Sequence, residues 1–384
     1  MDPSSRELIT IEEFLTLSAK INYQLSSRSL KAPVLLSLVL GTTRYSERGQ
    51  QVLLEAFHAL RAGYDQDRRR LGTPGILHPL RAGALLVRTN SSSTLVELLA
   101  ALFHDKEEDL SEKDVGPERF ARMQGHYKAV LDMLLPEERE RVEDCIHCLS
   151  NHCPSYSEYV GQITDNARRL PELLHVKLSD RIDNTFDVHL QHPGVSNYNF
   201  YRAVFDILFL PTFRGVSMGE FHFMPDTAEG VMLLSQLFKN TILLAMLRAS
   251  RLDTQDETTR RLFVGLAVAG IREAQWLALE MFNTVYRDVD RQRELLLEVM
   301  EYCAGGGVES VRAEKAAGDL DGVFVAFTSG TKADQKRMLV ELFEDRERLA
   351  RMSLAFIVVF AAFINDPNYT LKGIGRTGAC PCAA

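Results

Sequence analysis

Along most of this chain, apolar residues recur every three or four positions, and the strict alternation typical of a half-buried strand is scarce. In residues 53–64, for example, Leu53, Phe57, Leu60 and Tyr64 share one face of a helix. Such a spacing brings apolar side chains onto a single face only when the backbone is helical. The pattern therefore predicts an all-α protein.

The length predicts more than one helical domain, because 384 residues are enough for two or three cores of ordinary size. We expect an N-terminal helical extension at 1–44, a helical domain at 45–215, a C-terminal helical domain at 216–365 and a flexible tail at 366–384. In the C-terminal domain, helices are expected at 228–251, 258–286, 291–302 and 333–364. Its long apolar stripes exceed what one helical layer buries, so we expect it to pack on the preceding domain or to form a homo-oligomer.

Charge and cysteine usage exclude several classes of protein. The chain has 44 Lys and Arg against 52 Asp and Glu, a net charge of −8, so no nucleic acid partner is expected. The 6 cysteines are too few for a disulfide scaffold, and the first residues show no secretory signal. The longest apolar run, 354–364, is about half the length that spans a bilayer. We therefore expect a cytoplasmic protein with no membrane partner.

Three of the expected helices present polar residues suited to one joint site. Pro79 fits the first turn of a helix and fixes His78 at its start. The next helix begins with a capping-box pattern and ends at His104 and Asp105. In the helix expected at 171–188, a polar stripe opposite the apolar face contains Lys177, Asp180, Arg181 and Asn184.

Two imidazoles and two carboxylates from three helices would form a mixed nitrogen and oxygen site for a divalent metal such as Mn²⁺, Fe²⁺ or Zn²⁺. Taken singly, each residue has an ordinary explanation: a histidine at a helix start is usually structural, and an aspartate on a polar stripe is usually solvated. The ordered set carries the hypothesis, in which the metal ligands are His78, His104, Asp105 and Asp180.

Residues 51–189 resemble the HD-domain phosphohydrolases, in particular the hydrolase domain of the RelA/SpoT-type alarmone enzymes and their small stand-alone relatives. The matching pieces, in order, are Arg69 and Arg70 leading through Gly72-Thr73-Pro74 to His78-Pro79, then residues 102–109, then residues 176–181 with Asn184. The resemblance implies an HD-domain helical fold with one divalent ion, Mn²⁺ as first choice. His78, His104, Asp105 and Asp180 would be its ligands.

The resemblance also implies roles for neighbouring residues. Glu108 and Asp109 match the acidic pair that orients and deprotonates the attacking water. Arg69 and Arg70 match a basic pair that contacts the nucleotide, and the amide of Asn184 would hold a ribose or phosphate oxygen. Lys177, on the same face, would bind substrate or serve only as an ion-pair partner of Asp180. The alternative for Glu108 and Asp109 is a solvated acidic loop. The alternative for Arg69 and Arg70 is a solvated run of charged residues.

The implied reaction is removal of the 3′-pyrophosphate from guanosine tetra- or pentaphosphate, a small phosphorylated nucleotide. No synthetase domain is recognised after the hydrolase domain, and three positions depart from the family. One is Tyr64, where the family commonly has His, and the other two follow Asn184. Where the alarmone hydrolases usually carry Arg and Thr after Asn184, this chain has Phe186 and Asp187. If Asp187 faces the pocket, it would disfavour a nearby phosphate; otherwise it lies on the outer helix face. The alternatives are a phosphatase for another nucleotide, such as NADPH or a dNTP, and a non-catalytic nucleotide-sensing protein.

A second group of residues whose side chains can bind a metal lies at 145–153. It consists of Cys145, His147, Cys148, His152 and Cys153. Cys145, Cys148 and His152 on one helical face would suit Zn²⁺. However, Cys145 also continues an apolar stripe with Val142, Ile146 and Leu149, and the spacing matches no known zinc module. We therefore interpret the cysteines as core residues.

Overall fold

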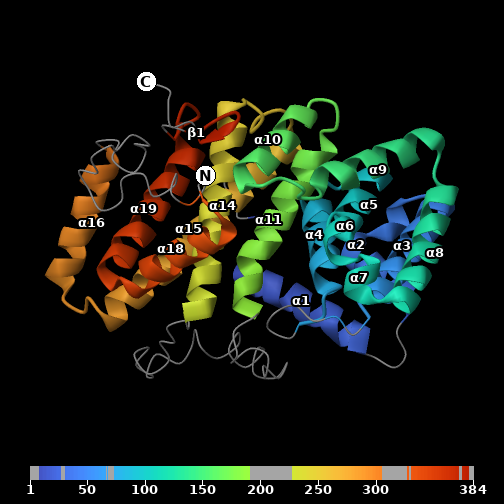
Figure 1. The fold of residues 1–384 in the computed structure, drawn as a ribbon, viewed down its shortest axis with the longest axis horizontal. Helices are drawn as coiled ribbons and strands as arrows, with labels where there is room; N and C mark the ends of the chain where they lie inside the picture. The colour runs from blue at the N-terminus through green and yellow to red at the C-terminus, as the bar shows by residue number, and fades with distance from the viewer. Residues whose placement is uncertain are drawn as a thin grey trace. The chain divides into compact units, whose positions relative to one another are not determined.

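The computed structural model is an all-α fold, as the apolar spacing predicts (Figure 1). It describes residues 8–26, 31–65, 67, 73–190, 227–304, 327, 330–371 and 374–379. The chain divides into two compact units. The first unit is Met1–His152 with Asp165–Tyr201, and the second unit is Cys153–Thr164 with Arg202–Ala384. The expected N-terminal extension thus belongs to the same unit as the candidate metal ligands.

The first unit is built from helices around one apolar core. They are α1 (Ile11–Ser26), α2 (Ala32–Leu40), the 3-10 helix η2 (Thr42–Arg44), α3 (Glu47–Gly63), α4 (Leu77–Thr89), α5 (Leu95–Phe103), α6 (Lys106–Asp109), α7 (Glu112–Val115), α8 (Pro117–Met133), α9 (Pro136–Leu149) and α11 (Glu172–Leu190). Helix α4 packs against α5 and α11, and α3 packs against α8 (Figure 1). The stripe predicted on α3 is buried, with Phe57 fully enclosed.

Local sequence signals fix where the site-bearing helices begin. Pro79 lies in the first turn of α4, where the backbone donor that it lacks has no partner within the helix. The capping box of α5 forms as expected: Thr94 N donates to Glu97 Oε2 at 2.6 Å, and Glu97 N donates to Thr94 Oγ1 at 3.1 Å. Glu97 Oε1 also lies 2.6 Å from His175 Nδ1, so one glutamate both begins α5 and ties it to α11.

The second unit is also helical. Its elements are α14 (Thr227–Ala249), α15 (Glu257–Thr284), α16 (Val289–Ala304), α18 (Lys332–Glu344), α19 (Arg346–Asn365) and the strands β1 (Ile374–Gly375) and β2 (Gly378–Ala379); α10 (Tyr156–Asn166) crosses the boundary between the units. The single helix expected at 333–364 is wrong, because it divides at Asp345. The Asp345 backbone is extended, and its side chain accepts a hydrogen bond from Arg348 N at 3.1 Å, which begins α19.

The residues expected to form a tail contain ordered structure in their described part. Strands β1 and β2 pair antiparallel, with Ile374 opposite Ala379. Leu371 and Ile374 are buried, and β1 packs against α14. This part of the chain is therefore packed within the second unit.

Two described helices, α14 and α15, are long and apolar enough to cross a bilayer. Within their most apolar windows, 78% and 56% of the residues are buried inside the structure. Core helices of soluble proteins have the same property, so the two helices are weak evidence for a membrane protein.

Candidate metal centre

The four predicted metal ligands lie in the first unit, at the ends or on the inner face of three packed helices. His78 lies in the first turn of α4, His104 follows the last residue of α5, and Asp105 begins α6. Asp180 lies in the middle of α11, which packs against both α4 and α5. The packing of these helices brings together residues that are far apart in the sequence.

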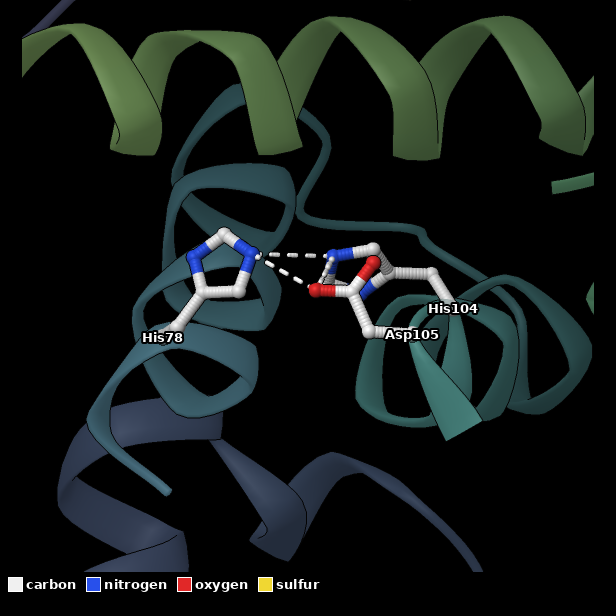
Figure 2. A group of neighbouring side chains, drawn as sticks. All are labelled: His78, His104 and Asp105. Atoms are coloured by element: carbon white, nitrogen blue, oxygen red, sulfur yellow. Dashed lines mark hydrogen bonds and ion pairs between the residues drawn. The ribbon is translucent and has the colours of Figure 1, made fainter. Parts of the chain in front are cut away.

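The facing atoms of these side chains are closely grouped. His78 Nε2 lies 3.0 Å from His104 Nε2, and Asp105 Oδ2 lies 3.2 Å from each of them (Figure 2). Asp180 Oδ1 lies 3.2 Å from His78 Nε2 and 3.5 Å from His104 Nε2. Divalent ions bind imidazole at about 2.1 Å, which separates neighbouring ligand atoms by about 3.0 Å in octahedral and about 3.4 Å in tetrahedral geometry. The residues present therefore fit a divalent metal ion.

The second nitrogen of each imidazole is held so that Nε2 is left to bind a metal. His104 Nδ1 lies 2.8 Å from the carbonyl oxygen of Ala101, which accepts hydrogen bonds only, so Nδ1 is the protonated nitrogen. His78 Nδ1 lies 2.6 Å from the carboxylate of Asp183. A carboxylate or carbonyl behind a histidine fixes its ring and tautomer, as in many metal sites.

The electrostatics of the centre favour a positive charge. Burial disfavours the charged form of His104, but Asp105 and Asp180 outweigh it and hold the pKa of His104 well above its usual value. Burial likewise opposes ionisation of Asp180, but Lys177 and the two imidazoles hold the pKa of Asp180 well below its usual value. Burial opposes ionisation of Asp105 too, but His104 and His78 lower its pKa, so both carboxylates are charged at neutral pH, as metal ligands must be.

A fully buried ion network supports the centre from behind, and sequence reasoning missed it. Arg81 donates from Nε to Asp183 Oδ1 at 2.7 Å and from Nη2 to Asp183 Oδ2 at 3.0 Å, and it also donates to Asp187. Burial opposes ionisation of Asp183, but Arg81 and then His78 lower its pKa. Arg81 thus holds the carboxylate that in turn holds the His78 ring. The available signal was spacing, since Arg81 follows His78, and Asp183 follows Asp180, by one helical turn.

Replacing Arg81 with methionine is expected to lower the free energy of unfolding by about 3–5 kcal/mol, because two buried carboxylates would lose their compensating charge. The measurement is chemical denaturation of wild type and variant in a chelator, so that metal binding does not contribute. The matched control is Arg88→Met on the same helix. Arg88 pairs with Glu13 at 3.9 Å and both side chains are exposed, so its loss should cost less than about 1 kcal/mol. Equal costs for the two variants would contradict a supporting role for the network.

The expectation that Asp187 faces either the pocket or solvent is wrong. Asp187 is fully buried and accepts a hydrogen bond from Arg81. Phe186 is buried too, with its ring centroid 5.3 Å from that of Phe14 on α1. Both side chains therefore belong to the core, and neither is placed to contact a nucleotide.

Lys177 and Asn184 both contact the metal-ligand aspartate. Lys177 Nζ donates to Asp180 Oδ2 at 2.8 Å, and Asn184 Nδ2 donates to Asp180 Oδ1 at 2.5 Å. Lys177 is therefore an ion-pair partner of Asp180, the alternative that the sequence left open. In this arrangement both residues orient a ligand of the centre, and contact with substrate stays a prediction.

Glu108 and Asp109 lie on the short helix α6 directly after Asp105, and both side chains are exposed. Glu108 Oε1 accepts a hydrogen bond from Asn151 N at 2.8 Å, and Asp109 Oδ2 lies 3.5 Å from the Tyr64 hydroxyl. Asp105 is the most exposed of the four candidate ligands, with 26% of its side chain accessible. Glu108 and Asp109 therefore come shortly after Asp105 in the chain, on the solvent-exposed side of the centre.

Two other sequence predictions have different outcomes. Arg69 and Arg70 lie outside the described residues, so their contact with nucleotide stays a prediction. Cys145 and Cys148 are buried, and burial raises the pKa of both thiols. A buried, protonated thiol is a poor metal ligand, and neither of the candidate metal groups among the described residues contains a cysteine.

The fold and the site define an all-helical protein with a candidate divalent-metal centre of two histidines and two aspartates. No family model matches the chain, and comparisons with curated proteins and with solved structures also find no match. The functional argument therefore depends on the geometry of the centre and on the residues around it.

Proposed function

We propose that this protein is a divalent-metal-dependent phosphohydrolase that removes phosphate or pyrophosphate from a nucleotide. The observation that carries the proposal is the grouping of His78, His104, Asp105 and Asp180, with both imidazoles presenting Nε2 to the same point. Two imidazoles and two carboxylates suit Mn²⁺, Fe²⁺ or Zn²⁺, and binding of the ion would displace the proton from His104. We take Mn²⁺ as the first ion to test, in line with the resemblance to alarmone hydrolases.

A bound divalent ion supplies two effects, a lowered pKa of coordinated water and polarisation of a phosphoryl oxygen. The chain itself supplies the proton acceptor, which we assign to Glu108 with Asp109 beside it. Asn151 N donates to Glu108 Oε1, which orients the carboxylate that we assign as general base. The exposure of Asp105 and of the acidic pair leaves this side of the centre open to a substrate phosphate.

The first substrate to test is guanosine 3′,5′-bis(diphosphate), hydrolysed at its 3′-pyrophosphate. This choice depends on the resemblance of residues 51–189, including Arg69 and Arg70, to the alarmone hydrolases. The burial of Phe186 and Asp187 removes two side chains that would otherwise distinguish among nucleotides. Other phosphorylated nucleotides, such as NADPH and dNTPs, therefore belong in the same screen.

The test is a turnover screen of the full chain with Mn²⁺ against guanosine tetraphosphate, NADPH and the dNTPs, with release of phosphate and pyrophosphate measured separately. We expect pyrophosphate from guanosine tetraphosphate, and its loss when a chelator removes the metal. Phosphate release from a different nucleotide would correct the substrate. Tight nucleotide binding with no turnover in Mn²⁺, Fe²⁺ or Zn²⁺ would overturn the enzyme proposal in favour of a nucleotide sensor.

A further inference from the structure

A second group of metal-binding side chains lies beside the candidate centre, formed by Glu107 on α6, His147 on α9 and His152 just after α9. The ligand atoms of these three residues all lie within 4.8 Å of one another. Glu107 Oε2 is 3.2 Å from His152 Nε2 and 3.8 Å from His147 Nδ1. One carboxylate oxygen thus faces two imidazole nitrogens.

The chemistry of this group matches a cation site of the zinc class. Two histidines and one glutamate are a ligand set that Zn²⁺ accepts, with water completing the coordination. The exposed fractions of the side chains are 34% for Glu107, 68% for His147 and 56% for His152, so a hydrated ion reaches them without any opening of the fold. An ordinary surface ion pair needs only one histidine against the carboxylate, and such a pair adds little stability.

The site also joins two segments that are already in contact. Glu107 and Glu108 are consecutive on α6, and Asn151 and His152 are consecutive after α9. The hydrogen bond from Asn151 N to Glu108 Oε1 connects the same two segments at 2.8 Å. An ion held by Glu107, His147 and His152 would therefore fasten the short helix α6 to the end of α9.

We propose that Glu107, His147 and His152 form a second divalent-cation site, selective for Zn²⁺-class ions, that fastens α6 to α9. This site shares no ligand with the first centre. Its oxygen and imidazole ligands favour Zn²⁺ over Mg²⁺ or Ca²⁺, which prefer sites made of oxygen alone. It is independent of the proposed hydrolysis, since it requires only that these three side chains bind an ion.

The experiment is a Zn²⁺ titration of the metal-free full chain by calorimetry, with equilibrium dialysis to count bound ions. We expect wild type to bind two ions, His147→Ala/His152→Ala to bind one, and His152→Ala alone to weaken the second ion by roughly tenfold or more. In the double variant, Zn²⁺ should also give a smaller rise in Tm, because α6 is no longer fastened. Circular dichroism checks that the substitutions leave the helices intact.

The matched control is His126→Ala, which removes a half-exposed histidine that pairs with a glutamate, Glu55, at 2.8 Å. This variant should bind as many ions as wild type. Equal stoichiometry and affinity in wild type and in His147→Ala/His152→Ala would overturn the second site. If instead the first centre binds no ion, wild type binds one ion and His147→Ala/His152→Ala binds none. The two outcomes are therefore distinguishable.

Discussion

Asp105→Ala is expected to empty the first metal centre and to abolish hydrolysis. Asp105 Oδ2 lies 3.2 Å from both His78 Nε2 and His104 Nε2, so its loss removes a ligand and a negative charge from the middle of the donor set. We expect metal affinity to fall by at least about 100-fold, since loss of a direct ligand costs more than loss of an outer partner. Metal content after dialysis and initial rates on the active nucleotide measure both effects.

The matched control for this variant is Glu112→Ala, which removes an exposed carboxylate from the neighbouring helix α7. Its metal content and rate should equal those of wild type. Full metal occupancy in Asp105→Ala would show that Asp105 is not a ligand. If activity is also lost at full occupancy, Asp105 contacts the substrate and does not bind the metal.

Glu108→Gln is expected to lower kcat by roughly two to four orders of magnitude, the effect of losing a general base. Glutamine keeps the size of the side chain, and its carbonyl oxygen still accepts the hydrogen bond from Asn151 N. Because Glu108 is not in the ligand set, metal content and KM should stay close to wild type. Steady-state kinetics with metal analysis on the same preparation separate these effects.

Asp109 lies next to Glu108, so the double variant Glu108→Gln/Asp109→Asn guards against one carboxylate replacing the other. Its kcat should be lower still. Wild-type turnover in the double variant would mean that the acidic pair is a solvated loop and that another group accepts the proton. Glu112→Gln gives the same chemical change on α7 and should leave kcat unchanged.

Features decided within one helical turn could be predicted from the sequence. The capping box of Thr94 and Glu97 formed as expected and fixes the start of α5. The apolar stripe of α3 is buried as predicted. A boundary of this kind that was missed is Asp345, where an N-cap residue inside a long apolar pattern divides α18 from α19. The apolar spacing here favours one continuous helix, whereas Asp345 favours a new helix start, and the N-cap decides the outcome.

The candidate centre was predictable only as a set of residue types in order. The sequence placed His78, His104, Asp105 and Asp180 at helix ends or on a polar stripe. The structure brings their side chains together, with each carboxylate oxygen 3.2 to 3.5 Å from the two imidazole Nε2 atoms and 3.0 Å between those two atoms. The second group was missed because Glu107 belongs to a different segment. The sequence grouped the histidines with Cys145 and Cys148, whose side chains enter the core as predicted.

The sequence by itself determined the all-α class, the starts of the site-bearing helices α4 and α5 and the residue types of the first centre, because these depend on spacing and on contacts within about four positions. Only the tertiary structure decided which polar residues are buried and what they pair with. Arg81 meets Asp183 across 102 positions, and Asp187 faces that arginine rather than a ligand or solvent. Such pairings follow from how α4 and α11 pack together, and no local interaction in either helix specifies that packing.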